Sequence, residues 1–348
     1  MSLSQSKYPA FGLDFGTFHI KVVDLVHKND TSSLRGLAAV PLPKPGVDIT
    51  QQNKHELIRS LKEVVRSAKP DSVKSHFVVS ALPESKVFSQ VLVMPKMEKE
   101  ELDTAISFEA GKSMPLPKEE SYIDYSIMKE RKDGRLEILV VGTEKNLVEF
   151  YRALIRAAGF ELLVLETKPL AGIRALLAPQ EKSTVVLVDI GAKNSSITLY
   201  DRGEFQSSIT HSSGGEKFVE ALSKSQGADR NKVLEMLQKI RQEDLKEDEI
   251  LRVLYPLFEE IKAKIAESIS FWGEKKEKPL EIKKIILAGG GAVTPGLVGY
   301  LNKDLGVETV VGNPLINLEP KSTEKIDRNR IMSFTTAIGL ALRRIDNI

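Results

Sequence analysis

Residues 11–25 read FGLDFGTFHIKVVDL, and residues 185–200 read VVLVDIGAKNSSITLY. Each stretch runs from an apolar strand through Asp-x-Gly into a tight turn and a second apolar strand, which is the pattern of a β-hairpin. The two aspartates of the motif, Asp14 and Asp189, lie about half the chain apart. The repeat predicts an α/β protein made of two copies of one domain, with a cleft between its halves.

The Asp-x-Gly motif has a chemical use as well as a structural one. A glycine after the strand lets backbone N–H groups approach a phosphate, because no Cβ atom stands in the way. An aspartate at the strand end can orient Mg²⁺ or its bound waters. One copy is also ordinary turn chemistry, so a plain hairpin is the alternative for either motif alone. Two copies, each at the start of a half, favour a phosphate site.

A third stretch, residues 284–296, reads KIILAGGGAVTPG. We expect a strand that runs into three glycines, and then a helix that begins near Thr294 with Pro295 at its first position. Three glycines let the chain pass flat against a planar ligand, and a helix N-terminus favours an anion. The stretch matches neither the P-loop nor the dinucleotide-binding fingerprint. A flexible loop between strand and helix is the alternative to a ligand site.

Composition narrows the classes of function. Hydrophobic residues make up 41% of the chain and charged residues 28%, as in soluble globular proteins. The net charge of +2 gives no nucleic-acid footprint, and the lack of cysteine excludes disulfides, thiolate zinc sites and cysteine nucleophiles. No apolar stretch approaches the ~18 residues that span a bilayer. We therefore expect any membrane role to go through a partner or an exposed face.

Hydrophobic periodicity predicts several elements of an α/β fold. Helices are expected over residues 55–67, 145–158 and 248–272, and Pro256 should start or kink the last of them. The C-terminal segment 330–344 has helical spacing and reads as a packed terminal helix. Short apolar runs predict strands at residues 77–80, 137–141, 162–165, 185–188 and 284–287.

Residues 85–140 break the alternation of strand and helix. Their order is strand, helix, strand, strand, which predicts a small α+β subdomain inserted in the first half. The predicted division of the chain is residues 1–84 and 141–180 for the first half, 85–140 for the insert, and 181–348 for the second half, with a helical subdomain at about 220–278.

The three loops 14–16, 189–191 and 288–291 resemble, in order, the two phosphate loops and the adenosine loop of the actin superfamily, whose domains are ribonuclease H-like. The segments in and beside the insert resemble those of the type IV pilus assembly protein PilM family, and the insertion shares its placement with the cell-division protein FtsA. The segments that carry this resemblance are SALP at 80–83, VLVMP at 91–95, EEL at 100–102, FE at 108–109, MPLP at 114–117 and IDY at 123–125.

The resemblance implies a site for ATP and Mg²⁺. Asp14 and Asp189 would lie near the metal, and Glu166 and Asp189 would be catalytic, with Glu166 positioning the attacking water. A charged residue at a strand end is the alternative for Glu166. The residues expected to bind the nucleotide are Asp14, Gly16, Thr17, Lys21, Gly191, Ala192, Gly214, Gly215, Lys264, Gly289, Gly290, Gly291 and Ala292.

The chain departs from the family pattern next to the phosphate loops. Phe18 and His19 add bulk where phosphate should rest, and Phe218 and Val219 stand where a hydroxyl is usual. These changes predict weak to moderate ATP binding and slow turnover at most.

The resemblance also implies a role as a scaffold. We expect a cytoplasmic protein, peripheral to the inner membrane through its partners, that grips the cytoplasmic N-terminal tail of a PilN-like inner-membrane protein during assembly of a type IV pilus or a related secretion machine. Self-association is left open. The alternatives are a structural secretion component that no longer needs nucleotide, and a small-molecule kinase on the same fold.

Overall fold

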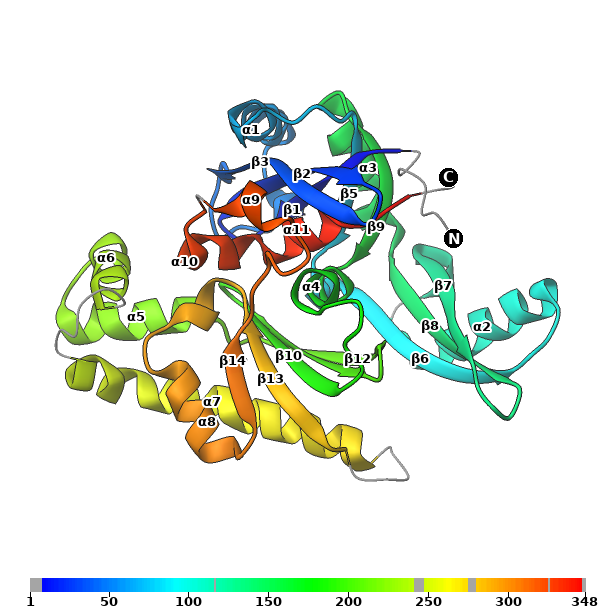
Figure 1. The fold of residues 1–348 in the computed structure, drawn as a ribbon. Coiled ribbons are helices and arrows are strands. Elements are labelled where there is room, and N and C mark those ends of the chain that lie inside the picture. The colour runs from blue at the N-terminus through cyan, green and yellow to red at the C-terminus, as the bar shows by residue number, and fades with distance from the viewer. Residues whose placement is uncertain (1–7, 116, 241–246, 275–279, 325, 346–348) are drawn as a thin grey trace.

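The computed structural model describes residues 8–115, 117–240, 247–274, 280–324 and 326–345. Two sheets, each flanked by helices, form the body of the molecule, and a smaller sheet with one helix stands off its side (Figure 1). The duplicated α/β architecture predicted from the two hairpins is confirmed. Among the described residues, no helix has the length and apolar character needed to cross a bilayer.

The sheet of the first half has six strands in the order β4-β3-β2-β1-β5-β9. Strands β1, β2 and β3 form an antiparallel meander, while β1, β5 and β9 run parallel. Parallel strands bring their carboxyl ends to one edge of the sheet, where α/β proteins place ligands. The bounds are β1 Ala10–Phe15, β2 His19–Lys28, β3 Thr31–Pro41, β4 Lys69–Pro70, β5 Phe77–Leu82 and β9 Glu161–Thr167.

Each face of this sheet is covered by a pair of helices. On one face, α1 (Lys54–Ser67) and α3 (Lys145–Ala157) bury the alternate β1 residues Phe11, Leu13 and Phe15. On the other face, α4 (Lys168–Leu176) and α11 (Thr335–Ala341) approach the backbone closely. A Cβ atom at Gly12 would lie 2.1 Å from the carbonyl oxygen of Ala337, so only glycine fits beneath α11.

The second half repeats this plan. Its five strands lie in the order β12-β11-β10-β13-β14, and β10 pairs antiparallel with β11 and parallel with β13, as β1 does with β2 and β5. The strand bounds are β10 Thr184–Ile190, β11 Ser195–Asp201, β12 Glu204–His211, β13 Ile282–Ala288 and β14 Glu308–Val311. The helices are α5 Gly215–Gln226, α6 Arg230–Ile240, α7 Glu247–Glu274 and α8 Leu297–Leu305.

A separate three-stranded antiparallel sheet, ordered β6-β8-β7, stands off the side of the two halves (Figure 1). Its elements follow one another in the predicted order: β6 Val87–Pro95, α2 Lys99–Ser113, β7 Ser121–Glu130 and β8 Arg135–Glu144. Helix α2 covers one face and closes a small core of its own around Leu102, Ile106 and Ile138. We call this unit the insert.

Short elements complete the chain. They are η1 Ile49–Gln51, η2 Glu84–Lys86, η3 Lys118–Glu120, η4 Gly290–Val293, α9 Pro320–Thr323, α10 Arg328–Ile331 and η5 Met332–Phe334.

Two helix predictions were wrong, near Thr294 and in the C-terminal segment. The helix predicted over residues 248–272 is α7, which begins before Pro256 and runs through it. One lost backbone hydrogen bond is tolerated there, because the apolar stripe of α7 packs without interruption on the second half. The helix expected at Thr294 begins instead at Leu297, after Gly296 in the left-handed conformation with φ 78°. The C-terminal segment is not one helix, since α10, η5 and α11 follow each other.

Candidate functional site

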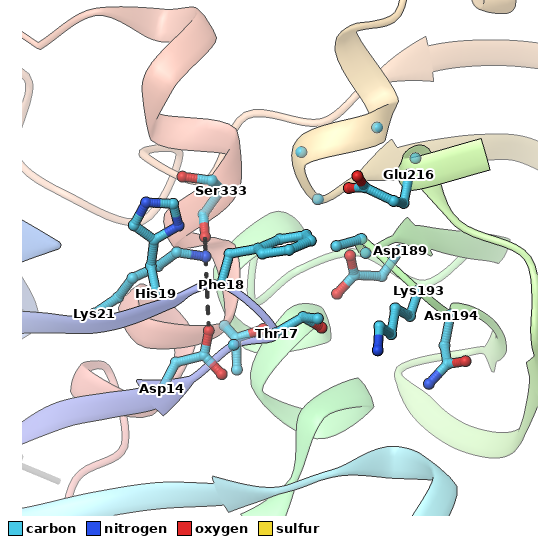
Figure 2. Close-up of a pocket in the computed structure, with 18 of the residues that line it drawn as sticks. Asp14, Thr17, Phe18, His19, Lys21, Asp189, Lys193, Asn194, Glu216 and Ser333 are labelled. Atoms are coloured by element: carbon cyan, nitrogen blue, oxygen red, sulfur yellow. Dashed lines mark hydrogen bonds and ion pairs between the residues drawn. The ribbon is translucent and has the colours of Figure 1, made fainter. Parts of the chain in front are cut away.

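A cavity of about 760 Å³ lies between the two halves and is lined by residues of both. Its volume falls in the range of roughly 300–1,000 Å³ that is typical of small-molecule sites. Residues from the first half face residues from the second half across it (Figure 2). The predicted site residues that line it are Asp14, Gly16, Thr17, Lys21, Asp189, Gly191, Ala192, Gly215, Gly289, Gly290 and Gly291.

The glycine loops of the second half lie directly against one another. Gly289 has φ 77°, and a Cβ atom there would be 2.2 Å from Oδ1 of Asp189. A Cβ at Gly291 would be 2.3 Å from Cγ2 of Ile190, and one at Gly214 would be 2.5 Å from the carbonyl oxygen of Ala192. Only glycine permits this approach, which leaves a smooth backbone wall for a ligand.

Backbone hydrogen bonds join the start of α5 to the loop after Asp189. The N–H of Gly215 donates to the carbonyl oxygen of Gly191 at 2.8 Å, and that of Glu216 donates to Ala192 at 2.9 Å. Gly214 lies behind this contact and does not line the cavity. It supports the site by letting the two loops meet.

Asp14 is a buried carboxylate with two lysines beside it. Lys168 donates from Nζ to Oδ1 of Asp14 at 2.9 Å. Lys21 lies 3.9 Å from Oδ2 of Asp14 and donates to the carbonyl oxygen of Ser333 at 2.6 Å (Figure 2). Burial alone would raise the pKa of Asp14, but the two lysines outweigh it and lower the pKa. Asp14 is therefore ionised at neutral pH.

Asp189 faces Asp14 across the cavity, on the second half (Figure 2). Its pKa is raised by burial and by the charge of Asp14, although Lys168 and Lys21 act in the opposite direction. Within the described part of the chain, no hydrogen bond or ion pair engages its carboxylate. A cation near Asp189 would stabilise its ionised carboxylate and supply the missing partner. Asp189 therefore fits the divalent metal that the resemblance implies.

The donor set does not form a metal site by itself. The described residues contain no group of three or more histidine, cysteine, aspartate or glutamate side chains placed to hold a metal ion. Mg²⁺ commonly keeps several waters and uses one or two carboxylates with substrate phosphates. The arrangement therefore fits a metal that arrives with a phosphorylated ligand.

Side chains also cross the cavity between the halves. Phe18 extends from the β1–β2 loop, and the guanidinium of Arg230 lies 4.6 Å from its ring centroid (Figure 2 shows Phe18). Arg230 also donates to both oxygens of Glu216, at 3.0 and 2.9 Å. His19 has its pKa lowered by partial desolvation and then by the charges of Lys21, Arg230 and Arg330. The contact between Phe18 and Arg230 occupies space next to the first phosphate loop.

A model of the type IV pilus assembly protein PilM family matches residues 12–345, which is nearly the whole chain. The chain belongs to the PilM family. Its structure is similar to a chain of the PilM–PilN type IV pilus biogenesis complex, with 25% sequence identity, a TM-score of 0.81, and coverage of 98% of this chain and 100% of that chain.

The fold of this PilM-family protein recurs in more distant proteins. The ethanolamine utilization protein EutJ from Carboxydothermus hydrogenoformans is 16% identical, with a TM-score of 0.54 and coverage of 98% of this chain and 90% of that chain. MreB 5 of Spiroplasma citri, bound to AMPPNP, is 12% identical, with a TM-score of 0.53 and coverage of 96% and 95%. At these identities the likeness shows the fold alone.

Two of the predicted PilM-like site residues lie outside the cavity lining, in ion pairs of their own. Glu166 is a buried carboxylate at the next-to-last position of β9. Arg174 donates to its two oxygens at 2.7 and 3.0 Å, and Arg343 adds a further ion pair. Lys264 lies on α7 and pairs with Glu267 at 2.7 Å. The structure therefore does not bring Glu166 or Lys264 together with the other predicted residues. Ala292 is fully buried behind the glycine loop.

Lys168 and Glu84 are among the cavity residues that sequence reasoning missed. Lys168 begins α4, and a lysine at a helix N-terminus is unfavourable to the helix dipole unless it has another partner. That position was a usable signal that Lys168 has an acidic partner, although it did not identify Asp14. Glu84, directly after Pro83 and β5, gave no signal, because its burial depends on the second half of the chain.

Proposed function

We propose that this PilM-family protein is a nucleotide-binding scaffold in the assembly of a type IV pilus or a related secretion machine, and that its cavity takes ATP with Mg²⁺. The observation that carries the proposal is the meeting of the glycine loops and the two Asp-x-Gly turns around one cavity. The match of nearly the whole chain to the PilM family supports a role for the protein in pilus assembly.

The residues have distinct roles in this proposal. Gly289 to Gly291 lie against the nucleoside, and the loops at Gly16 and Gly191 lie against the phosphates. Asp14 and Asp189 hold the metal's waters, and the metal offsets the phosphate charge when bound. Lys21 and Lys168 supply further positive charge at the same end of the cavity.

The cavity favours modest affinity and slow turnover. Phe18 occupies space beside the first phosphate loop and is held there by Arg230. A nucleotide must displace or fit around this contact, which costs affinity. We therefore propose a protein in which nucleotide governs shape or assembly, with hydrolysis at most slow.

We further propose that the insert and the adjoining first half bind the cytoplasmic N-terminal tail of a PilN-like inner-membrane protein. The similar solved protein is part of a PilM–PilN complex. In the insert, β6 and β7 are the outer strands of the small sheet, and outer strands can accept an extended peptide. Exposed apolar side chains lie on these strands at Val93, Tyr122 and Ile127. This partner would hold the cytoplasmic protein at the membrane.

The partner proposal predicts a localised loss of binding. Tyr122→Ala should weaken binding of the partner's synthetic tail peptide about tenfold, as expected when an exposed aromatic anchor is truncated. Fluorescence anisotropy of the labelled peptide would measure it. The matched control is Tyr255→Ala on α7, because Tyr255 is 43% exposed and Tyr122 is 44% exposed. Equal affinity of both variants and the wild type would place the peptide elsewhere.

A further inference from the structure

Glu84 lies where three parts of the molecule meet. It is the first residue of η2, which joins β5 of the first half to β6 of the insert. Its side chain lines the cavity, and Ser208 on β12 of the second half is a hydrogen-bond partner. A residue at such a junction can act on a ligand held between the halves.

The topology places Glu84 at the phosphate end of the cavity. Strands β1, β5 and β9 are parallel neighbours. Asp14 is the next-to-last residue of β1, Glu84 follows β5 by two residues, and Lys168 follows β9 directly. The carboxyl ends of three adjacent parallel strands thus bring these three side chains to one edge of the sheet. Asp189 faces this edge from the second half.

One carboxylate oxygen of Glu84 has no partner. Oε2 is buried, and among the described residues no donor reaches it. Buried acceptors are nearly always satisfied by protein, by water or by a ligand. Glu84 lines the cavity, so its unsatisfied oxygen marks a position for a water molecule or a ligand donor.

The charged groups around Glu84 come from both halves. Burial and the charge of Asp189 raise the pKa of Glu84 to about 7, while Lys168 and the hydrogen bond with Ser208 act in the opposite direction. A carboxylate in this range can accept a proton near neutral pH better than an exposed glutamate can. Glu166 differs, because arginines already occupy both of its oxygens.

We propose that Glu84 orients the attacking water in slow nucleotide hydrolysis and accepts its proton. The inference rests on the proposed nucleotide site. In the step, the water oxygen bonds to the γ-phosphorus, and the bond from that phosphorus to the β–γ bridging oxygen breaks. The proton of the water passes to Oε2 of Glu84 and then to solvent, and ADP and phosphate leave.

The test separates binding from turnover. Glu84→Gln keeps the shape but cannot accept the proton, so we expect phosphate release to fall about 10- to 100-fold. Calorimetric affinity for AMPPNP with Mg²⁺ should stay within about threefold, because the side chain acts on the water. Glu84→Asp should recover part of the rate. The matched control is Glu161→Gln, at the exposed amino end of β9, which should turn over like the wild type.

Each contrary result has a distinct meaning. Unchanged phosphate release by Glu84→Gln, or a wild type that binds AMPPNP without hydrolysing ATP, would overturn the role of Glu84 and leave the proposed scaffold standing. A wild type that binds no AMPPNP would overturn both the nucleotide site and this inference. If thermal unfolding shows that Glu84→Gln does not fold, Glu84→Asp decides: slower phosphate release with AMPPNP affinity retained supports the role, whereas a wild-type rate contradicts it.

Discussion

At the scale of single residues, the base of the cavity depends on the buried ion pair between Asp14 and Lys168. The Asp14 side chain is 5% exposed and that of Lys168 is 22% exposed, so water screens the pair poorly. The Asp-x-Gly pattern predicted the aspartate, because that motif is local in sequence. It could not predict the lysine's partner, since the two residues meet only when β1 and β9 join the same sheet.

The ion pair gives a prediction about stability and pH. Lys168→Met leaves Asp14 with only the more distant Lys21, and we expect a loss of about 3 kcal/mol in the free energy of unfolding at pH 7. The pKa of folded Asp14 is lowered, so its ionised form stabilises the fold above the ordinary value of 3.8. That stabilisation is lost as pH falls through the lowered pKa. The difference in the free energy of unfolding between the wild type and Lys168→Met should therefore be smaller at acid pH.

Urea unfolding at pH 7 and at about pH 3 would measure both effects. The double variant with Asp14→Asn gives the pairwise coupling. Equal stability of Lys168→Met and the wild type at pH 7 would mean that the pair does not stabilise the fold.

At the scale of elements, α4 and α11 pack together beneath the first sheet and toward the second (Figure 1). A Cβ atom at Gly339 of α11 would lie 1.8 Å from the carbonyl oxygen of Ala171 in α4. Helices α4 and α11 can therefore approach this closely only because residue 339 is glycine. Sequence periodicity indicated a terminal helix, but it could not show that η5 breaks it or that its glycine faces another helix, since both depend on the contact.

Gly339→Ala should destabilise the protein, because the helices must move apart. We expect a loss of about 1–3 kcal/mol or more in the free energy of unfolding, as for an overpacked core. The matched control is Gly299→Ala in α8, where no atom lies within 4 Å of the added Cβ. Alanine has the higher helix propensity, so this control should be neutral or slightly stabilising. Similar thermal midpoints for the two variants would contradict the close contact.

At the scale of the whole molecule, side-chain contacts join the two halves across the cavity. These include the stack of Arg230 on Phe18 and the hydrogen bond from Lys193 to the carbonyl oxygen of Gly46. Lys129 of the insert also forms an ion pair with Glu204 of the second half. The two hairpins in the sequence were sufficient to predict two halves and a shared cavity. Contacts between the halves were not predictable, because they join segments far apart in sequence.

The central claim is that the cavity binds ATP with its metal, and calorimetric titration of ATP with and without Mg²⁺ tests it most directly. We predict that wild-type affinity increases with Mg²⁺ and that Asp189→Asn loses this increase, with a drop of roughly tenfold or more, as for a charge-assisted contact of about 1.5–3 kcal/mol. Unchanged Mg²⁺-dependent affinity in Asp189→Asn would contradict the assigned role of the cavity. A wild type that binds no ATP would favour a scaffold that works without nucleotide.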